Sequence, residues 1–169
     1  CFNNHFGMFV IWLKAVLGIG YAELDEYCSL FSWPKRVGTA IGLDALRPPR
    51  CTNSIKAKEL KVNASEGRSL IGVLAHYVRR KFLNHADSLV QLHAKCFLLL
   101  YTIVSFLFQA ERPGISAAAP MRLQKYVREY IELVADLYGS SQMQKKLHFL
   151  IHFPYLLMRF VRLPSCWAL

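Results

Sequence analysis

The chain is short of acidic residues. Only 11 of its 169 residues are Asp or Glu, against 21 Lys or Arg, which gives a formal net charge of +10. Acid–base or two-metal catalysis requires several carboxylates that converge in one pocket. Three of the acids here cluster at 23–26, and another three alternate with basic residues along 122–136. We therefore expect no catalytic residues and predict no enzyme activity for this chain.

Other common signatures are also missing. The sequence has no Gly-rich phosphate loop, no G-x-S-x-G turn, no C-x-x-C pair and no internal repeat. Its five cysteines are odd in number and far apart, which indicates reduced thiols and an intracellular protein, nuclear or cytoplasmic. The first residue is Cys1 rather than Met, so we expect a fragment of a larger protein.

What the chain has in excess is apolar residues, which make up 54% of it. A composition this apolar excludes a disordered tail, and the length suits one domain, 1–169. The run 96–110 is apolar around the whole helix, as in a helix buried in a protein core or in lipid. Lys95 precedes this run and Glu111 follows it, whereas a membrane span needs about 20 predominantly apolar residues. We expect a central core helix, with membrane association as the alternative.

Helical periodicity dominates the rest of the sequence. Apolar residues at intervals of three and four predict an amphipathic helix over 121–138, ended by Gly139. Asn63 and Glu66 have the spacing of a capping box, ahead of a helix with an apolar stripe over 70–78.

Two shorter helices are predicted at 21–31 and 145–161, the second kinked or restarted at Pro154. The stretch 34–53 is rich in Pro and Arg and predicts a long exposed loop. The fold class we expect is all-α, an irregular helical bundle around the central helix at 96–110.

Two histidines have a spacing used by metal-binding helices. His148 and His152 are four residues apart, which places both imidazoles on one face of a helix. No Glu follows His148, and a third ligand such as Cys166 or His76 would have to come from elsewhere in the fold. We therefore predict no metal site and interpret the pair as half-buried histidines that hydrogen-bond a neighbouring turn.

The positive charge is grouped rather than evenly spread. Grouped Lys and Arg side chains favour a polyanionic partner such as DNA, although they also suit a solubilising shell around an apolar core. The predicted nucleic-acid-binding residues are Arg79, Arg80, Lys81, Lys145, Lys146, Arg159 and Arg162.

Four segments together resemble one family. They are Trp-Pro-Lys-Arg at 33–36, Asn-Ala-Ser-Glu-Gly-Arg-Ser-Leu at 63–70, Lys-Leu-His-Phe-Leu-Ile-His-Phe-Pro-Tyr at 146–155 and Leu-Pro-Ser-Cys-Trp-Ala-Leu at 163–169. In this order they resemble CACTA-like, transposon-derived proteins, and His148, His152 and Trp167 match the family motif. The sequence departs from that motif at Lys145, where Pro is usual, and at Val161, where Gly is common.

The resemblance implies an all-helical insertion in a ribonuclease H-like nuclease whose Asp, Asp and Glu bind two Mg ions. The family's Asp-x-x-His element would precede Cys1, and its last acid would follow Trp167. This chain would then be a non-catalytic scaffold with no cofactor of its own, whose partners are DNA and the remainder of a larger transposase-like chain. Apolar surface separated from that remainder would favour self-association. Two alternatives are a small helical membrane-associated protein and a separate nucleic-acid-binding module.

Overall fold

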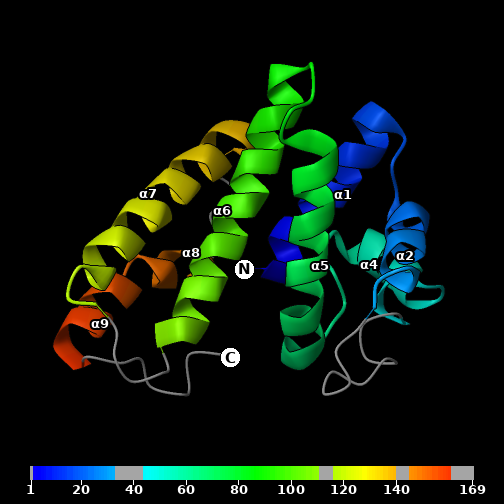
Figure 1. Ribbon diagram of the computed structural model, residues 1–169. Helices are drawn as coiled ribbons and strands as arrows, with labels where there is room; N and C mark the ends of the chain where they lie inside the picture. Colours follow the sequence, from blue (N-terminus) through cyan, green and yellow to red (C-terminus); the bar gives the residue numbers. More distant parts are fainter. Residues whose placement is uncertain (1, 33–43, 111–115, 140–144, 161–169) are drawn as a thin grey trace. The chain divides into compact units, whose positions relative to one another are not determined.

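The protein is all-helical in the computed structural model (Figure 1). The structure describes residues 2–32, 44–110, 116–139 and 145–160, and within these ranges every regular element is a helix. The predicted fold class is therefore confirmed. The described helices form two compact units, Phe2–His85 and the part of the chain from Ala86 onward, and each is considered separately below. The single domain over 1–169 stays a prediction.

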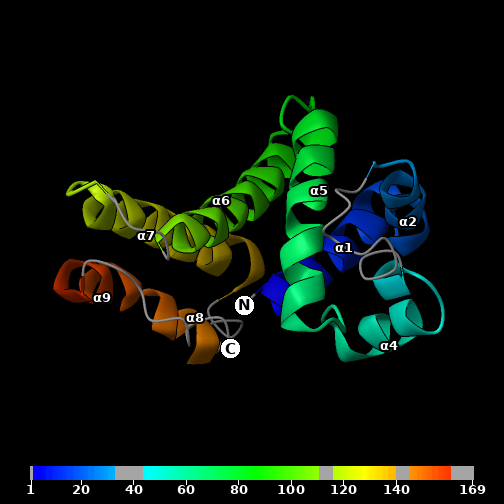
Figure 2. The ribbon, with the colours of Figure 1, turned by 60° about the horizontal axis from the view of Figure 1, so that its bottom comes forward.

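The first unit is built from one long helix and several short ones. Its elements are α1 (Phe2–Leu17), α2 (Tyr21–Ser29), the 3-10 turn η1 (Asp44–Leu46), α4 (Arg50–Ala57) and α5 (Ala64–Phe82). In Figure 2, α1 lies between α5 and α2. The ring of Phe6 on α1 meets the ring of Tyr21 on α2 edge to face, with centroids 6.2 Å apart. Leu13, Leu24 and Leu74 are also fully buried, so all three of these helices contribute to one core.

The segment after α4 runs back along the start of α1. The Leu60 amide donates to the Asn3 carbonyl at 2.7 Å, and the Asn3 side-chain amide donates to the Val62 carbonyl at 3.0 Å. A Cβ atom at Gly7 would lie 2.5 Å from the Glu59 Cα. Only glycine fits here, because the added Cβ would meet the backbone at Glu59, which cannot move aside as a flexible side chain could.

The start of α5 has the predicted capping box. The Asn63 side chain accepts from the Glu66 amide at 2.9 Å, and the Glu66 carboxylate accepts from the Asn63 amide at 2.9 Å. Arg50 of α4 adds a bidentate pair to the same carboxylate at 2.8 and 2.7 Å. The Arg50 hydrogen bonds lower the pKa of Glu66 from its ordinary value. One carboxylate therefore caps α5 and ties it to α4.

The predicted loop at 34–53 is shorter than expected where the structure describes it. Residues 34–43 lie outside the described ranges, but η1 buries Ala45 and Leu46, and α4 begins at Arg50. Pro49 occupies the N-cap position of α4. Proline is compatible with a helix start because the first helical amides have no intrahelical partner, so these prolines mark a helix boundary. The predicted helix at 21–31 also ends earlier, at Ser29.

The second unit contains the central apolar helix. Its elements are α6 (Ser88–Ala110), α7 (Ala119–Tyr138), α8 (Lys145–Leu150) and α9 (Phe153–Phe160), and α7 packs against both α6 and α9. Compared with the prediction, α6 begins at Ser88 rather than Cys96, because its first turns are amphipathic: Val90 is buried whereas Leu89 and Leu92 are exposed. The amphipathic helix ending at Gly139 is confirmed as α7, and Gly139 has a positive φ of 84°. The chain restarts a helix around Pro154 rather than bending one.

Candidate nucleic-acid interface

The exposed face of α5 is basic. Arg68, His76, Arg79 and Arg80 are all exposed, and their spacing of eight, eleven and twelve residues from Arg68 places them on one side of a helix with 3.6 residues per turn. Gly72 lies on the same side, and no atom is within 4 Å of the position that its Cβ would take. The opposite side of α5 is buried through Leu70, Leu74, Tyr77 and Val78. We refer to Arg68, His76, Arg79 and Arg80 as the basic face of α5.

The three predicted residues at the end of α5 are not equivalent. The Lys81 ammonium lies 3.9 Å from the Glu23 carboxylate of α2, with both side chains partly exposed. Within the described part of the chain, no ion pair joins a carboxylate to Arg79 or Arg80. The guanidinium groups of Arg79 and Arg80 therefore remain available to an external anion, while Glu23 partly neutralises the positive charge of Lys81.

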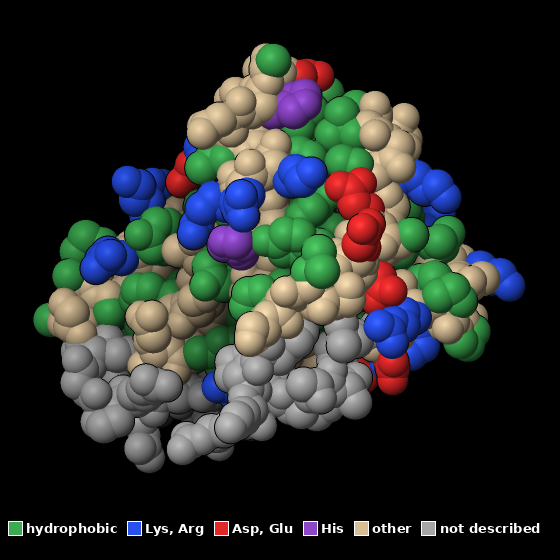
Figure 3. Space-filling model, turned by 45° about the vertical axis from the view of Figure 1, so that its right-hand side comes forward, with side chains coloured by type: hydrophobic (Ala, Val, Ile, Leu, Met, Phe, Trp, Pro, Cys, Tyr) green, Lys and Arg blue, Asp and Glu red, His purple; other side chains and the backbone are tan. Residues whose placement is uncertain are grey.

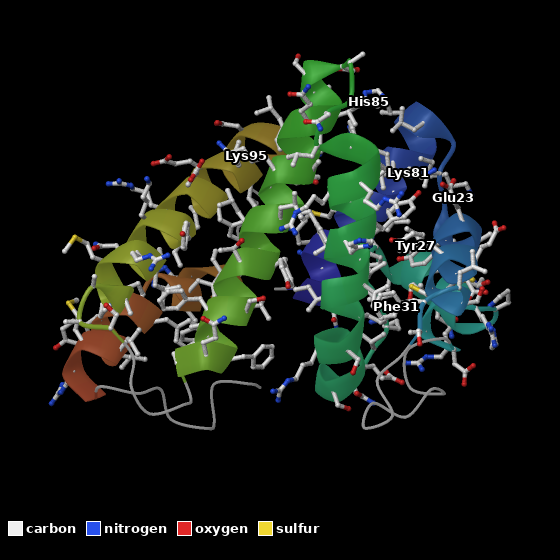
Figure 4. The ribbon with its side chains drawn as sticks, in the orientation of Figure 1. Glu23, Tyr27, Phe31, Lys81, His85 and Lys95 are labelled. Atoms are coloured by element: carbon white, nitrogen blue, oxygen red, sulfur yellow. The ribbon has the colours of Figure 1, made fainter. Side chains whose placement is uncertain are left out.

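A polar seam joins α2 to α5 next to this face. The Tyr27 hydroxyl lies 2.5 Å from His76 Nδ1, and the Tyr77 hydroxyl donates to the Glu23 carboxylate at 2.6 Å. Figure 4 shows Glu23 and Tyr27 on α2, with Lys81 nearby on α5. Burial, with the Glu23 carboxylate acting in the same direction, raises the pKa of Tyr77 above its ordinary value. The seam holds the His76 ring in place and keeps Tyr77 protonated.

Acidic side chains form a line beside Lys, Arg and His side chains on the face shown in Figure 3. On α2 the acids are Glu23, Asp25 and Glu26. Asp25 accepts from the Arg47 guanidinium at 3.2 Å, which ties α2 to the end of η1. Glu23 and Asp25 are thus engaged by neighbouring side chains. In the described ranges no three His, Cys, Asp or Glu side chains are grouped so that they would hold a metal ion.

The polar groups between α6 and α7 are structural. His93 Nδ1 lies 2.9 Å from the Tyr138 hydroxyl, and burial lowers the pKa of His93 to about 4. Near the surface, the Lys95 ammonium lies 2.6 Å from the Glu129 carboxylate.

Burial raises the pKa of Cys96 to about 12, so its thiol has little thiolate character and low reactivity. Among the described cysteines, Cys28, Cys51 and Cys96 form no disulfide, and the reduced state stays a prediction.

The other predicted basic residues belong to the second unit. Lys145 and Lys146 form the first turn of α8, but their side chains lie outside what the structure describes, as do Arg162 and Trp167. Arg159 is exposed in the last turn of α9. The predicted basic residues are therefore divided between the two units.

The histidine pair differs from the prediction in two ways. His148 is in α8, which ends at Leu150, whereas His152 is in the turn before α9, so the two do not share one helix. Both side chains are exposed rather than half-buried. The turn nevertheless brings their Nε2 atoms to 3.4 Å from each other.

Sequence reasoning missed Arg68 and His76. Their spacing to Arg79 and Arg80 along a predicted helix was a usable signal, because the four positions share one face. The partners of His76 and Tyr77 on α2 had no such signal, because they depend on how two helices pack.

Comparison with known proteins does not place the chain in a family. No family model matches the sequence, and no curated protein and no solved structure matches it.

Proposed function

We propose that this chain is a helical, non-catalytic part of a CACTA-like transposase that contacts DNA through the basic face of α5. The observation that carries the proposal is the exposure of Arg79 and Arg80 without a carboxylate ion pair in the described part of the chain. The motif segments at 146–155 and 163–169 support the link to the transposase family. In this proposal, the remainder of the larger chain supplies the catalytic acids and their Mg ions.

The geometry of the basic face suits a phosphate backbone. From Arg68 to Arg80 the helix rises by about 18 Å at 1.5 Å per residue. Duplex DNA carries one negative charge per about 1.7 Å of its axis, so a face of this length meets several phosphates. Arg side chains can donate two parallel hydrogen bonds to a phosphate. Contacts of this kind position a protein on DNA without reading its sequence.

The test measures binding of the full chain to a labelled DNA duplex over a range of salt concentrations. We expect affinity to fall linearly on a log–log plot, and Arg79→Gln with Arg80→Gln to reduce the slope by about 2, since each phosphate contact contributes about 0.9. The matched control is Arg122→Gln with Arg128→Gln, which removes the same charge from exposed positions of α7. Binding that is insensitive to salt, or that weakens equally in both double variants, contradicts the proposed interface.

Membership of the transposase family has a separate test. We expect the coding sequence around this segment to encode an Asp-x-x-His element upstream of Cys1 and an acidic residue shortly after Trp167. If the flanking sequence lacks both, the family assignment is wrong. DNA binding by the basic face would then indicate a nucleic-acid-binding module of another kind.

The second candidate is membrane association through α6. Ser88–Ala110 is long enough to cross a membrane and reaches a mean hydropathy of 1.6 over 18 residues, and 44% of that window is buried within the protein. α1 and α2 also pass this test as a pair, with a bend of 108° between them. Extraction of the expressed chain from membranes by alkaline carbonate would exclude an integral span, whereas retention would favour this second candidate.

A further inference from the structure

We propose that His148 and His152 together bind Zn²⁺ at the junction of α8 and α9. The two Nε2 atoms are 3.4 Å apart, whereas the ring centroids are 5.1 Å apart. The nitrogen-bearing edges are therefore closer to each other than the ring centres are. The rings meet edge to face, at an interplanar angle of 78°, and one ring N–H can donate to the other ring nitrogen, so an ion would take the place of that proton between them. This inference does not rest on the proposed DNA-binding function.

The separation of the two nitrogens matches the geometry of a tetrahedral zinc ion. Zn–N bonds of about 2.0–2.1 Å at a tetrahedral angle place two ligand nitrogens about 3.3–3.4 Å apart. The observed 3.4 Å between His148 and His152 agrees with this spacing. The distance between the two nitrogens is therefore compatible with one ion bound to both rings, after small rotations of the imidazoles.

Backbone hydrogen bonds hold the two histidines in this position. The His148 carbonyl accepts from the Ile151 amide at 3.2 Å, and the His152 amide donates to the Phe149 carbonyl at 3.1 Å. The His152 carbonyl in turn accepts from the Leu156 amide at 3.0 Å, at the start of α9. The turn is thus bonded on both sides of the pair, which lowers the entropy cost of ordering the two ligands when an ion binds.

The surroundings favour an open, exchangeable site rather than a closed one. Both imidazoles are exposed, so water can complete the coordination. No third His, Cys, Asp or Glu joins the pair among the residues that the structure describes. The sequence has no Asp or Glu after Asp136, so carboxylate oxygens from this part of the chain cannot recruit Mg²⁺ or Ca²⁺. Imidazole ligands instead suit zinc and neighbouring transition metals.

Binding at this site would couple the two C-terminal helices. His148 belongs to α8 and His152 leads into α9. An ion held by both rings binds the folded turn better than the unfolded chain, and so it stabilises the junction by mass action. The site therefore predicts a zinc-dependent change in the stability of this part of the protein.

The experiment titrates Zn²⁺ into the full chain under reducing conditions and follows the imidazole ring protons by NMR, with affinity measured against a competing chelator. We expect the His148 and His152 resonances to shift together. His148→Ala and His152→Ala should each weaken binding by more than about tenfold, because loss of a mere outer-shell partner already costs 10- to 100-fold. The control is Phe149→Ala, an exposed neighbour on α8 that leaves both imidazoles in place.

Each remaining outcome overturns the proposal. If zinc leaves both ring signals unchanged, the pair does not bind the ion. If affinity is the same in the two histidine variants, the ion is held elsewhere, for example by thiolates. If only one of the two variants loses binding, the ion uses a different second ligand. Helical circular dichroism of each variant shows whether it remains folded, and these exposed substitutions leave the helix cores intact.

Discussion

The contacts inside the first compact unit differ from the contacts inside the second. In the first, short elements are joined by specific polar ties, such as Arg50 to Glu66 and the Lys61 amide to the Ser54 hydroxyl at 2.9 Å. In the second, α6 and α7 have 23 and 20 residues and pack along buried apolar side chains, to which the His93–Tyr138 and Lys95–Glu129 contacts are added. Isolated helices shorter than about 12–15 residues are marginal in water. The 9-residue α2 and the 8-residue α4 therefore need ties at their ends, whereas long helices are stabilised along a whole face.

The largest expected effect is on apolar packing in the second unit. Leu100 of α6 is 1% exposed, and Leu100→Ala should lower the free energy of unfolding by about 2–5 kcal/mol, through lost burial and a residual cavity. Leu89→Ala on the same helix is the control, because that side chain is 45% exposed and should change stability by less than about 0.5 kcal/mol. Urea denaturation measures both. Equal effects would show that α6 is not a core helix.

The second prediction tests the close approach of backbones in the first unit. Gly7→Ala introduces a Cβ 2.5 Å from the Glu59 Cα and should cost about 1–3 kcal/mol, as overpacking usually does. Gly72→Ala is the matched control, since it lies inside α5 with open space around it. It should stabilise the protein by about 0.5–1 kcal/mol, because Ala has the higher helix propensity. Thermal denaturation should shift in opposite directions for the two variants, and a shift in the same direction would contradict the packing described here.

The third prediction separates a partly buried ion pair from an exposed one. Glu66→Gln keeps a side chain able to complete the capping box but removes the charge paired with Arg50, and should cost about 1–2 kcal/mol. Glu129→Gln removes the corresponding charge opposite Lys95 in the second unit. There the Lys95 side chain is 51% exposed, so the loss should be about 0–1 kcal/mol. If Glu129→Gln destabilises more than Glu66→Gln in denaturant titrations, the contrast between the units is wrong.

The fourth prediction concerns the pH dependence of stability. Burial lowers the pKa of His93 to about 4 in the folded state, whereas an unfolded His has a pKa of about 6.5. Between these values the unfolded chain binds more protons, so stability falls as pH decreases through this window. His93→Gln removes this contribution while keeping a side chain able to hydrogen-bond Tyr138. Urea midpoints at pH 7 and pH 5 should therefore differ less in the variant than in the wild type. An equal difference would contradict the lowered pKa of His93.

Local signals were the reliable part of the sequence prediction. The Asn63–Glu66 capping box and the termination of α7 at Gly139 depend on a few adjacent residues, and both were correctly predicted. The loop prediction at 34–53 was wrong beyond residue 43, because prolines that suit a loop also suit the residues just before a helix. For His148 and His152, a four-residue spacing implied one helix, yet the helix break between them still brought their Nε2 atoms together.

The sequence by itself determined the all-helical class, the main amphipathic and apolar helices and the concentration of positive charge on part of the chain. Periodicity and capping act within a turn or two of helix, so they can be read without knowing the fold. Tertiary structure alone decided that Glu66 pairs with Arg50, that Lys81 meets Glu23 while Arg79 and Arg80 do not meet a described carboxylate, and that Gly7 admits a second backbone. Each of these depends on side chains from different helices approaching within a few ångströms. No spacing along the chain specifies that approach.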